Sequence, residues 1–129
     1  MIRWRVLPAV LVLAAIMILP LGAGISAGEP TQTIKGELVD LRCYLTADKH
    51  GADHSGCATM CAKDNLPVGI LTSDGKLYTL IVQPAALAGS MALQAQVTGA
   101  VRGEMIVPDS VQVMKDGKWV ELKLPEQMM

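Results

Sequence analysis

The sequence predicts a small all-β domain, an OB-like barrel of five to six strands with a Cys/His-bearing insertion of loop and helix after the first strand. Three observations support this fold class. Short segments of alternating apolar and polar residues dominate the chain, two Asp-Gly pairs mark hairpin turns, and a short helical stretch separates the third strand from the fourth. A partly open five-stranded barrel has this order of elements, with an unrelated small β-sandwich or roll as the alternative.

The first half of the barrel contains one isolated strand and one hairpin. Thr33–Leu41 alternates around Ile34 and Leu38, and Gly36 within it predicts a bulge. Val68–Val82 reads as a hairpin, with Asp74-Gly75 as a two-residue turn of the type that matches the twist of the strands.

The second half begins with a helical segment and continues with strands. Pro84–Gly89 predicts one or two helical turns, since proline is tolerated in a first turn and glycine suits a helix end. Met91–Val101 predicts the next strand. Residues 104–122 predict a final hairpin, which turns at a second Asp-Gly pair, Asp116-Gly117.

Residues 1–27 have the pattern of an export segment, and residues 28–129 form the predicted domain. Arg3 and Arg5 precede an apolar stretch, and small residues follow it up to Ala27. The 22 uncharged residues at positions 6–27 are also long enough to span a bilayer as an uncleaved anchor. Either way we expect a periplasmic or otherwise extracytoplasmic domain, released or held at the inner membrane.

The charge of the predicted domain restricts the class of partner, and its composition restricts the residue types of its core. Beyond residue 27, nine basic residues face twelve acidic ones, a formal charge of −3, and this argues against nucleic acid as a partner. The same region contains only three aromatic residues, Tyr44, Tyr78 and Trp119. Its core is therefore expected to be aliphatic, and about a hundred residues suffice to bury one.

Residues 43–65 form an insertion that a barrel of this order does not require, and it is longer than most irregular connections. It holds every cysteine and histidine of the chain: Cys43, His50, His54, Cys57 and Cys61. We expect a helix that starts near Ser55 as N-cap and ends near Lys63, so that the last two cysteines share one face. Cys43, at the end of the first strand, would close on that face.

Four interpretations of this cluster compete. The thiols could be merely buried, although three free thiols are a liability in an oxidising compartment. A disulfide could join Cys43 to Cys57 or Cys61, whereas a Cys57–Cys61 bridge fits a regular helix poorly. A metal site is the third interpretation. Thiol redox chemistry is the fourth, and it lacks the Cys-x2-Cys motif of the disulfide oxidoreductases.

The metal site is the interpretation we favour, with Cys43, His54, Cys57 and Cys61 as ligands. Thiolates with imidazole suit zinc or copper, and His50 and Met60 are additional candidate ligands. Three aspartates of the insertion are candidates to orient the imidazoles by hydrogen bonding: Asp48, Asp53 and Asp64.

Several short motifs occur in order along residues 36–81. They are Gly36, Asp40 and Cys43-Tyr44, then His54-x2-Cys57-Ala58-x2-Cys61, then Pro67 and Gly69, then Asp74-Gly75-Lys76-x-Tyr78. In these motifs the chain resembles a group of small exported bacterial proteins of unassigned role. The resemblance implies an OB-like barrel with the insertion between its first two strands. It also implies Cys43, His54, Cys57 and Cys61 as the shared set, with His50 optional, and it implies no activity.

Nothing else in the sequence forms a catalytic constellation, so we expect a protein that is not an enzyme. The first hypothesis is an exported or membrane-tethered protein that holds one zinc or copper ion. The alternative is an accessory subunit of a larger membrane-associated or extracellular complex, in which the Cys/His cluster only stabilises a docking loop. A barrel that binds an oligosaccharide or a peptide ranks last, because few aromatic residues are present to stack on such a ligand.

Overall fold

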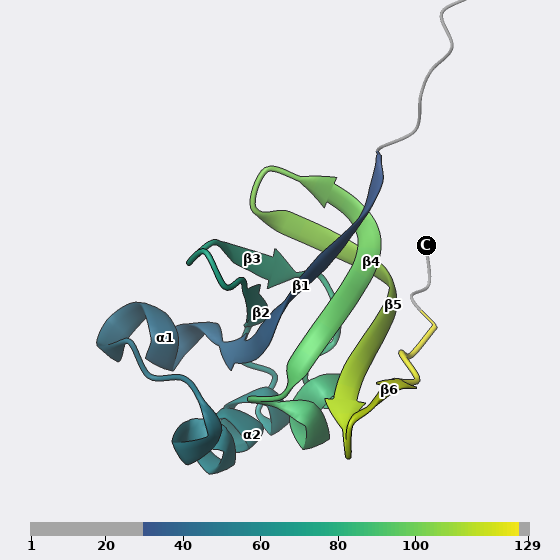
Figure 1. Ribbon diagram of the computed structural model, residues 1–129. Coiled ribbons are helices and arrows are strands. Elements are labelled where there is room, and N and C mark those ends of the chain that lie inside the picture. The colour runs from purple at the N-terminus through teal and green to yellow at the C-terminus, as the bar shows by residue number, and fades with distance from the viewer. Residues whose placement is uncertain (1–29, 127–129) are drawn as a thin grey trace, which may run out of the picture.

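A computed structural model describes residues 30–126, so the predicted signal peptide or anchor at residues 1–27 lies outside the described part of the chain (Figure 1). In chain order the elements are β1 (Thr31–Asp40), α1 (Leu41–Ala47), the 3₁₀ helix η1 (Ala52–His54), α2 (Ser55–Lys63), β2 (Val68–Leu71), β3 (Leu77–Leu80), the 3₁₀ helix η2 (Pro84–Ser90), β4 (Gln94–Arg102), β5 (Met105–Lys115) and β6 (Lys118–Glu121).

The first five strands close into a barrel. β1 pairs antiparallel with β4 along residues 31–37 and with β2 along residues 37–40. β2 pairs antiparallel with β3, and β4 pairs antiparallel with β5. Parallel pairing of β3 with β5 completes the ring, and β6 adds a sixth strand beside the C-terminal end of β5. The predicted OB-like barrel is confirmed, and so is the helical segment between the third and fourth strands.

The core is aliphatic, as the composition predicts, because no aromatic side chain is among the buried residues of the described domain. Its fully buried larger side chains come from five elements: Leu38, Val39, Val68, Ile70, Leu87, Val97, Ile106, Val111 and Val113. Ala58 and Ala62 of α2 also belong to this core, and α2 packs against η2. The insertion is therefore not separate from the barrel: α2 contributes to its core and covers one of its ends (Figure 1).

The end of β1 differs from the prediction. The strand ends at Asp40, whose backbone is still extended (φ −78°, ψ 129°), and Leu41 is already the first residue of α1. Cys43 therefore lies in the first turn of a helix and not at the end of a strand. The change of structure occurs here because the Asp40 side chain caps the helix.

The start of β4 is also later than predicted. Met91 is buried in the core at the end of η2, and Ala92 has a left-handed backbone (φ 68°) that interrupts the extended chain. The Ala92 amide donates to the Leu38 carbonyl, and the Leu38 amide donates to the Leu93 carbonyl. Regular strand pairing begins only at Gln94.

The two Asp-Gly-Lys segments form two different turns. At Asp116-Gly117 both residues have positive φ (50° and 74°), which is the two-residue type I′ turn that the sequence predicts. At Asp74-Gly75 only the glycine does (φ 84°), and its amide donates to the Thr72 carbonyl. The last paired residues of this hairpin are Leu71 and Leu77, with five residues between them, so the predicted two-residue turn is wrong there.

The bulge predicted at Gly36 is absent, because Gly36 lies opposite Ala95 without a shift in register. The irregularity of the sheet lies instead between Thr98 and Gly99 of β4. Gly36 has another role: a Cβ at this position would overlap the backbone carbonyl of Leu71, at the point where β1 passes from one partner strand to the other.

Substitution of Gly36 by alanine is expected to destabilise the domain by about 1–3 kcal/mol, since backbone and not a flexible side chain has to move. Gly89→Ala is the matched control, because open space surrounds that position and its φ is not positive, so a change below about 1 kcal/mol is expected. Urea denaturation of both variants measures the difference. Equal midpoints would contradict the close contact at Gly36.

Candidate metal centre

Cys43 is positioned by the cap of α1. The Asp40 carboxylate accepts a hydrogen bond from the Cys43 amide at 2.8 Å, which is the geometry of an N-cap residue and the third residue after it. At the other end of α1, Asp48 adopts a left-handed backbone and its amide donates to the Tyr44 carbonyl. The helix is therefore closed at both ends by backbone and side-chain hydrogen bonds.

The other cysteines are positioned by α2. The predicted helix from Ser55 to Lys63 is confirmed, but Ser55 is not its cap: it has helical dihedrals (φ −57°, ψ −39°) because η1 already coils the chain before it. Cys57 and Cys61 lie four residues apart and so share one face of the helix. Cys57 is exposed, whereas Cys61 and Cys43 are partly buried.

The donor atoms of the cluster form two groups that share Cys43. The outer group is Cys43, His54 and Cys57, and the inner group is Asp40, Cys43 and Cys61. Within each group the three donor atoms lie within 4.8 Å of one another. Two sulfurs on one tetrahedral zinc ion lie about 3.8 Å apart, so either group needs only a small contraction around an ion. These side chains are close enough to hold a metal ion.

The structure places three of the predicted ligands, Cys43, His54 and Cys57, in one group, and the fourth, Cys61, lies close to Cys43 in the other group. Among residues 30–126 no four donors all lie within that distance, because Cys61 groups with Asp40 and not with His54. Cys43 is the only predicted ligand common to both groups.

Asp40 holds His54 in place. Its carboxylate is fully buried and its second oxygen lies 2.9 Å from His54 Nε2, while the His54 side chain is only 15% exposed. Burial alone would raise the pKa of Asp40, yet hydrogen bonds from Cys43 and His54 keep this pKa below its usual value. Asp40 is therefore a carboxylate acceptor, and an imidazole whose Nε2–H donates to it has Nδ1 free as a ligand atom.

The aspartate that orients the imidazole is therefore not one of the three predicted, Asp48, Asp53 and Asp64, but Asp40. The sequence does contain a feature that points to Asp40: it lies between the apolar residues Val39 and Leu41 and three residues before a cysteine. A carboxylate at the end of an apolar strand is buried only with partners, and the Asp-x-x-Cys spacing is that of a helix cap.

The three cysteines are free thiols. A hydrogen bond to the Asp40 carboxylate, together with burial, raises the pKa of Cys43 to about 12. Burial raises the pKa of Cys61 as well, with a further contribution from the charge of Asp40. Thiol redox chemistry and metal binding both use the thiolate, so these two cysteines have to lose a proton in either role.

In the metal-free, reduced protein we expect iodoacetamide to alkylate Cys57 well before Cys43 and Cys61. Only the thiolate reacts, and at about pH 8 a thiol with a pKa of about 12 is ionised in roughly one molecule in 10⁴. Cys57 is in addition the exposed member of the three. Peptide mass spectrometry over time gives the order, and faster modification of Cys43 than of Cys57 would contradict the described environment.

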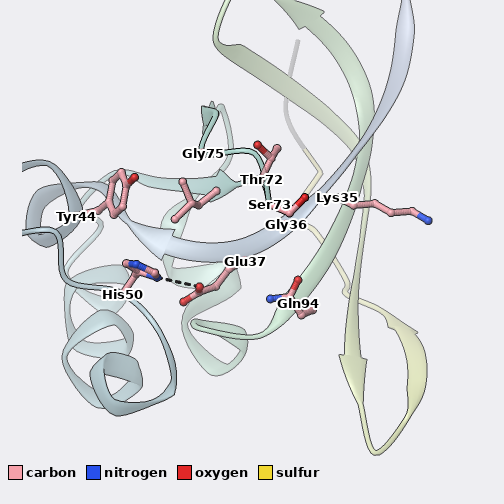
Figure 2. Close-up of a pocket in the computed structure, with 10 residues that line it drawn as sticks. Lys35, Gly36, Glu37, Tyr44, His50, Thr72, Ser73, Gly75 and Gln94 are labelled. Atoms are coloured by element: carbon pink, nitrogen blue, oxygen red, sulfur yellow. Dashed lines mark hydrogen bonds and ion pairs between the residues drawn. The ribbon is translucent and has the colours of Figure 1, made fainter.

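His50 does not belong to either donor group. Its Nδ1 lies 3.1 Å from Glu37 Oε2, and its ring meets that of Tyr44 edge to face at 5.7 Å (Figure 2). The Gly51 amide donates to the other oxygen of Glu37. These contacts fasten the loop after α1 to β1. As an additional ligand, His50 would have to leave Glu37.

A cavity of about 540 Å³ adjoins this contact, between β1 and the turn that joins β2 to β3. Tyr44, His50 and Glu37 line it together with Gln94, whereas the Lys35 side chain points away from them (Figure 2). A second hollow of about 460 Å³ is lined by both histidines, His50 and His54. Met60, the other additional candidate, is 59% exposed on α2.

Comparisons with known proteins do not add to this picture. The chain matches no protein-family model, and neither curated proteins nor solved structures give a significant match. None of the helices within residues 30–126 is long and apolar enough to cross a membrane. The function is therefore inferred from the residues and their geometry.

Proposed function

We propose that this protein binds one thiophilic metal ion, zinc or copper, through the cluster of Cys43, His54, Cys57 and Cys61. The observation that carries this proposal is the pair of donor groups, joined by Cys43, in which three thiols and one imidazole from α1, η1 and α2 lie close together. In the proposal the outer group binds first, and Cys61 completes the set of four.

The chemistry of the donors supports a metal more than a disulfide. A disulfide would use two thiols and leave one, and it would give no role to the buried carboxylate that orients His54. A carboxylate bonded to the far nitrogen of an imidazole is the usual support of a histidine that ligates a metal. Thiolates with one imidazole match zinc in a tetrahedral site and also match Cu⁺.

An ion here would not be required for folding. α1 and α2 are held by the Asp40 cap and by Ala58 and Ala62 in the core, without any contribution from a metal. Small domains that depend on zinc to fold lack such a core. We therefore expect the metal-free protein to keep its far-ultraviolet circular dichroism spectrum, and a collapse of that spectrum on chelation would favour a purely structural ion.

The proposed location is extracytoplasmic. It depends on the pattern of residues 1–27, which act in this proposal as a signal peptide or as an anchor in the inner membrane. Thiol sites in that compartment are exposed to oxidation, and a bound ion protects thiolates from it.

Elemental analysis and intact mass of the protein purified from its native compartment test the proposal. One equivalent of zinc or copper with three reduced thiols supports it. A metal-free protein lighter than the reduced mass by two hydrogens would replace it with a disulfide. The same mass reports whether residues 1–27 have been removed.

A second candidate function is an accessory subunit of a membrane-associated or extracellular complex. It is favoured by the two most exposed large apolar side chains of the described domain, Leu45 (68% exposed) and Met60 (59% exposed), which lie on α1 and α2. Under this alternative, Leu45→Glu would release the native protein from a larger assembly in gel filtration without changing its metal content.

A further inference from the structure

The ligands of the cluster differ in their access to solvent. Asp40 is fully buried beneath the cluster, the His54 side chain is 15% exposed, and Cys43 and Cys61 are partly buried. Cys57 alone among the thiols is exposed. Any molecule that approaches a bound ion from solution therefore meets the sulfur of Cys57 first.

The scaffold around the ligands keeps its shape without an ion. On α2 the face that carries Ala58 and Ala62 is buried in the core, so the position of Cys57 on that helix is set by apolar packing. The position of Cys43, the ligand shared by both groups, is fixed by the hydrogen bond from its own amide to the Asp40 carboxylate. Departure of an ion therefore requires no unfolding, only the exchange of its bonds to sulfur and nitrogen.

We propose that the protein is a metal donor that passes its ion to an acceptor bearing a free thiol, by ligand exchange that begins at Cys57. This inference rests on the proposed function. The acceptor thiol loses its proton as its sulfur bonds to the ion, the bond from Cys57 to the ion breaks, and the Cys57 thiolate takes up a proton. The remaining bonds, to Cys43, Cys61 and His54, are exchanged afterwards. No electrons are transferred, so no oxidant or reductant is needed.

The surface of α2 around Cys57 suits an acceptor that binds the ion through sulfur. Met60 lies three residues after Cys57 on α2 and exposes its thioether on a neighbouring part of the helix surface. Sulfur donors of this kind bind zinc and copper ions, Cu⁺ above all, whereas oxygen donors suit harder ions.

Transfer kinetics of the zinc-loaded, full-length protein test this inference. The zinc ion is passed to a chromophoric nitrogen–oxygen chelator with and without glutathione as the thiol probe. We expect the rate of transfer to rise in proportion to the glutathione concentration. A rate that is independent of glutathione would overturn the inference, because release would then be spontaneous dissociation.

Alkylation of the zinc-loaded protein shows which thiol leaves the ion first. We expect iodoacetamide to modify Cys57 first, with loss of zinc in step with that modification, while Cys43 and Cys61 stay protected until the zinc is lost. Equal protection of all three thiols, or first modification of Cys43 or Cys61, would overturn the inference and leave the proposed function standing. Failure of the proposed function is distinct, since no zinc would then bind at the start.

Discussion

Replacement of Cys43 by serine is expected to abolish metal binding. Cys43 belongs to both donor groups, so its loss leaves His54 and Cys57 on one side and Asp40 and Cys61 on the other, with no sulfur between them. Loss of a residue that only orients a ligand costs about 10–100-fold in affinity, and removal of the shared ligand should cost more than that range. Competition with a chromophoric chelator measures the affinity of each protein for zinc.

Two matched variants make this result specific. Cys57→Ser and Cys61→Ser each remove one thiol from only one group, so each should bind zinc more weakly than the wild type but more tightly than Cys43→Ser. Serine is close in size to cysteine, and the cap of α1 uses the backbone amide of residue 43, so all three variants should fold. Near wild-type affinity in Cys43→Ser would refute the shared role of this thiol.

Asp40→Asn is expected to lower the affinity for zinc by about 10–100-fold while it preserves the cap of α1. Asparagine is as good an N-cap as aspartate, so its oxygen can still accept from the Cys43 amide. Its amide group, however, would donate to His54 Nε2, and the imidazole would then carry its proton on Nδ1. The nitrogen left for the metal would thus lose its lone pair.

Asp64→Asn is the control. Asp64 is an exposed residue that follows α2, so its substitution should not change the affinity for zinc.

The stability of the metal-free proteins is a second measurement that tests the charge of Asp40. A carboxyl group whose folded pKa is lowered contributes stability above its unfolded pKa, about 3.9, and loses it as the pH falls through the folded value. The difference in free energy of unfolding between the wild type and Asp40→Asn, measured in urea, should therefore shrink as the pH is lowered. A difference that does not depend on pH would contradict the role of the charge.

Local patterns were sufficient for much of the fold. The alternating segments predict the strands and their order along the chain. The spacing of the cysteines and histidines, together with Ser55, predicts a helix close to α2. The aliphatic composition predicts the core. These features depend on residues close in sequence, where the periods of strands and helices apply directly.

Predictions were wrong where a side-chain hydrogen bond, and not the local pattern, decides the backbone conformation. The predicted first strand runs through Leu41, but the Asp40 carboxylate ends it, because its burial is stabilised by His54, which is 14 residues away. The two Asp-Gly-Lys segments have the same central residues, yet only Asp116-Gly117 forms the two-residue turn. Around Asp74 the Thr72 hydroxyl accepts from the Lys76 amide and stabilises a longer loop.

The sequence by itself determined that one barrel forms, that its core is aliphatic, and that every cysteine and histidine of the chain lies within one insertion. Only the tertiary structure decided how these side chains are used. His50 pairs with Glu37 and His54 with Asp40, two carboxylates three residues apart on the same strand. The sequence predicts neither pairing, because each depends on where the closed barrel places β1 against the insertion. That placement makes Asp40 the buried support of the cluster, Cys43 its shared thiol and Cys57 its exposed one.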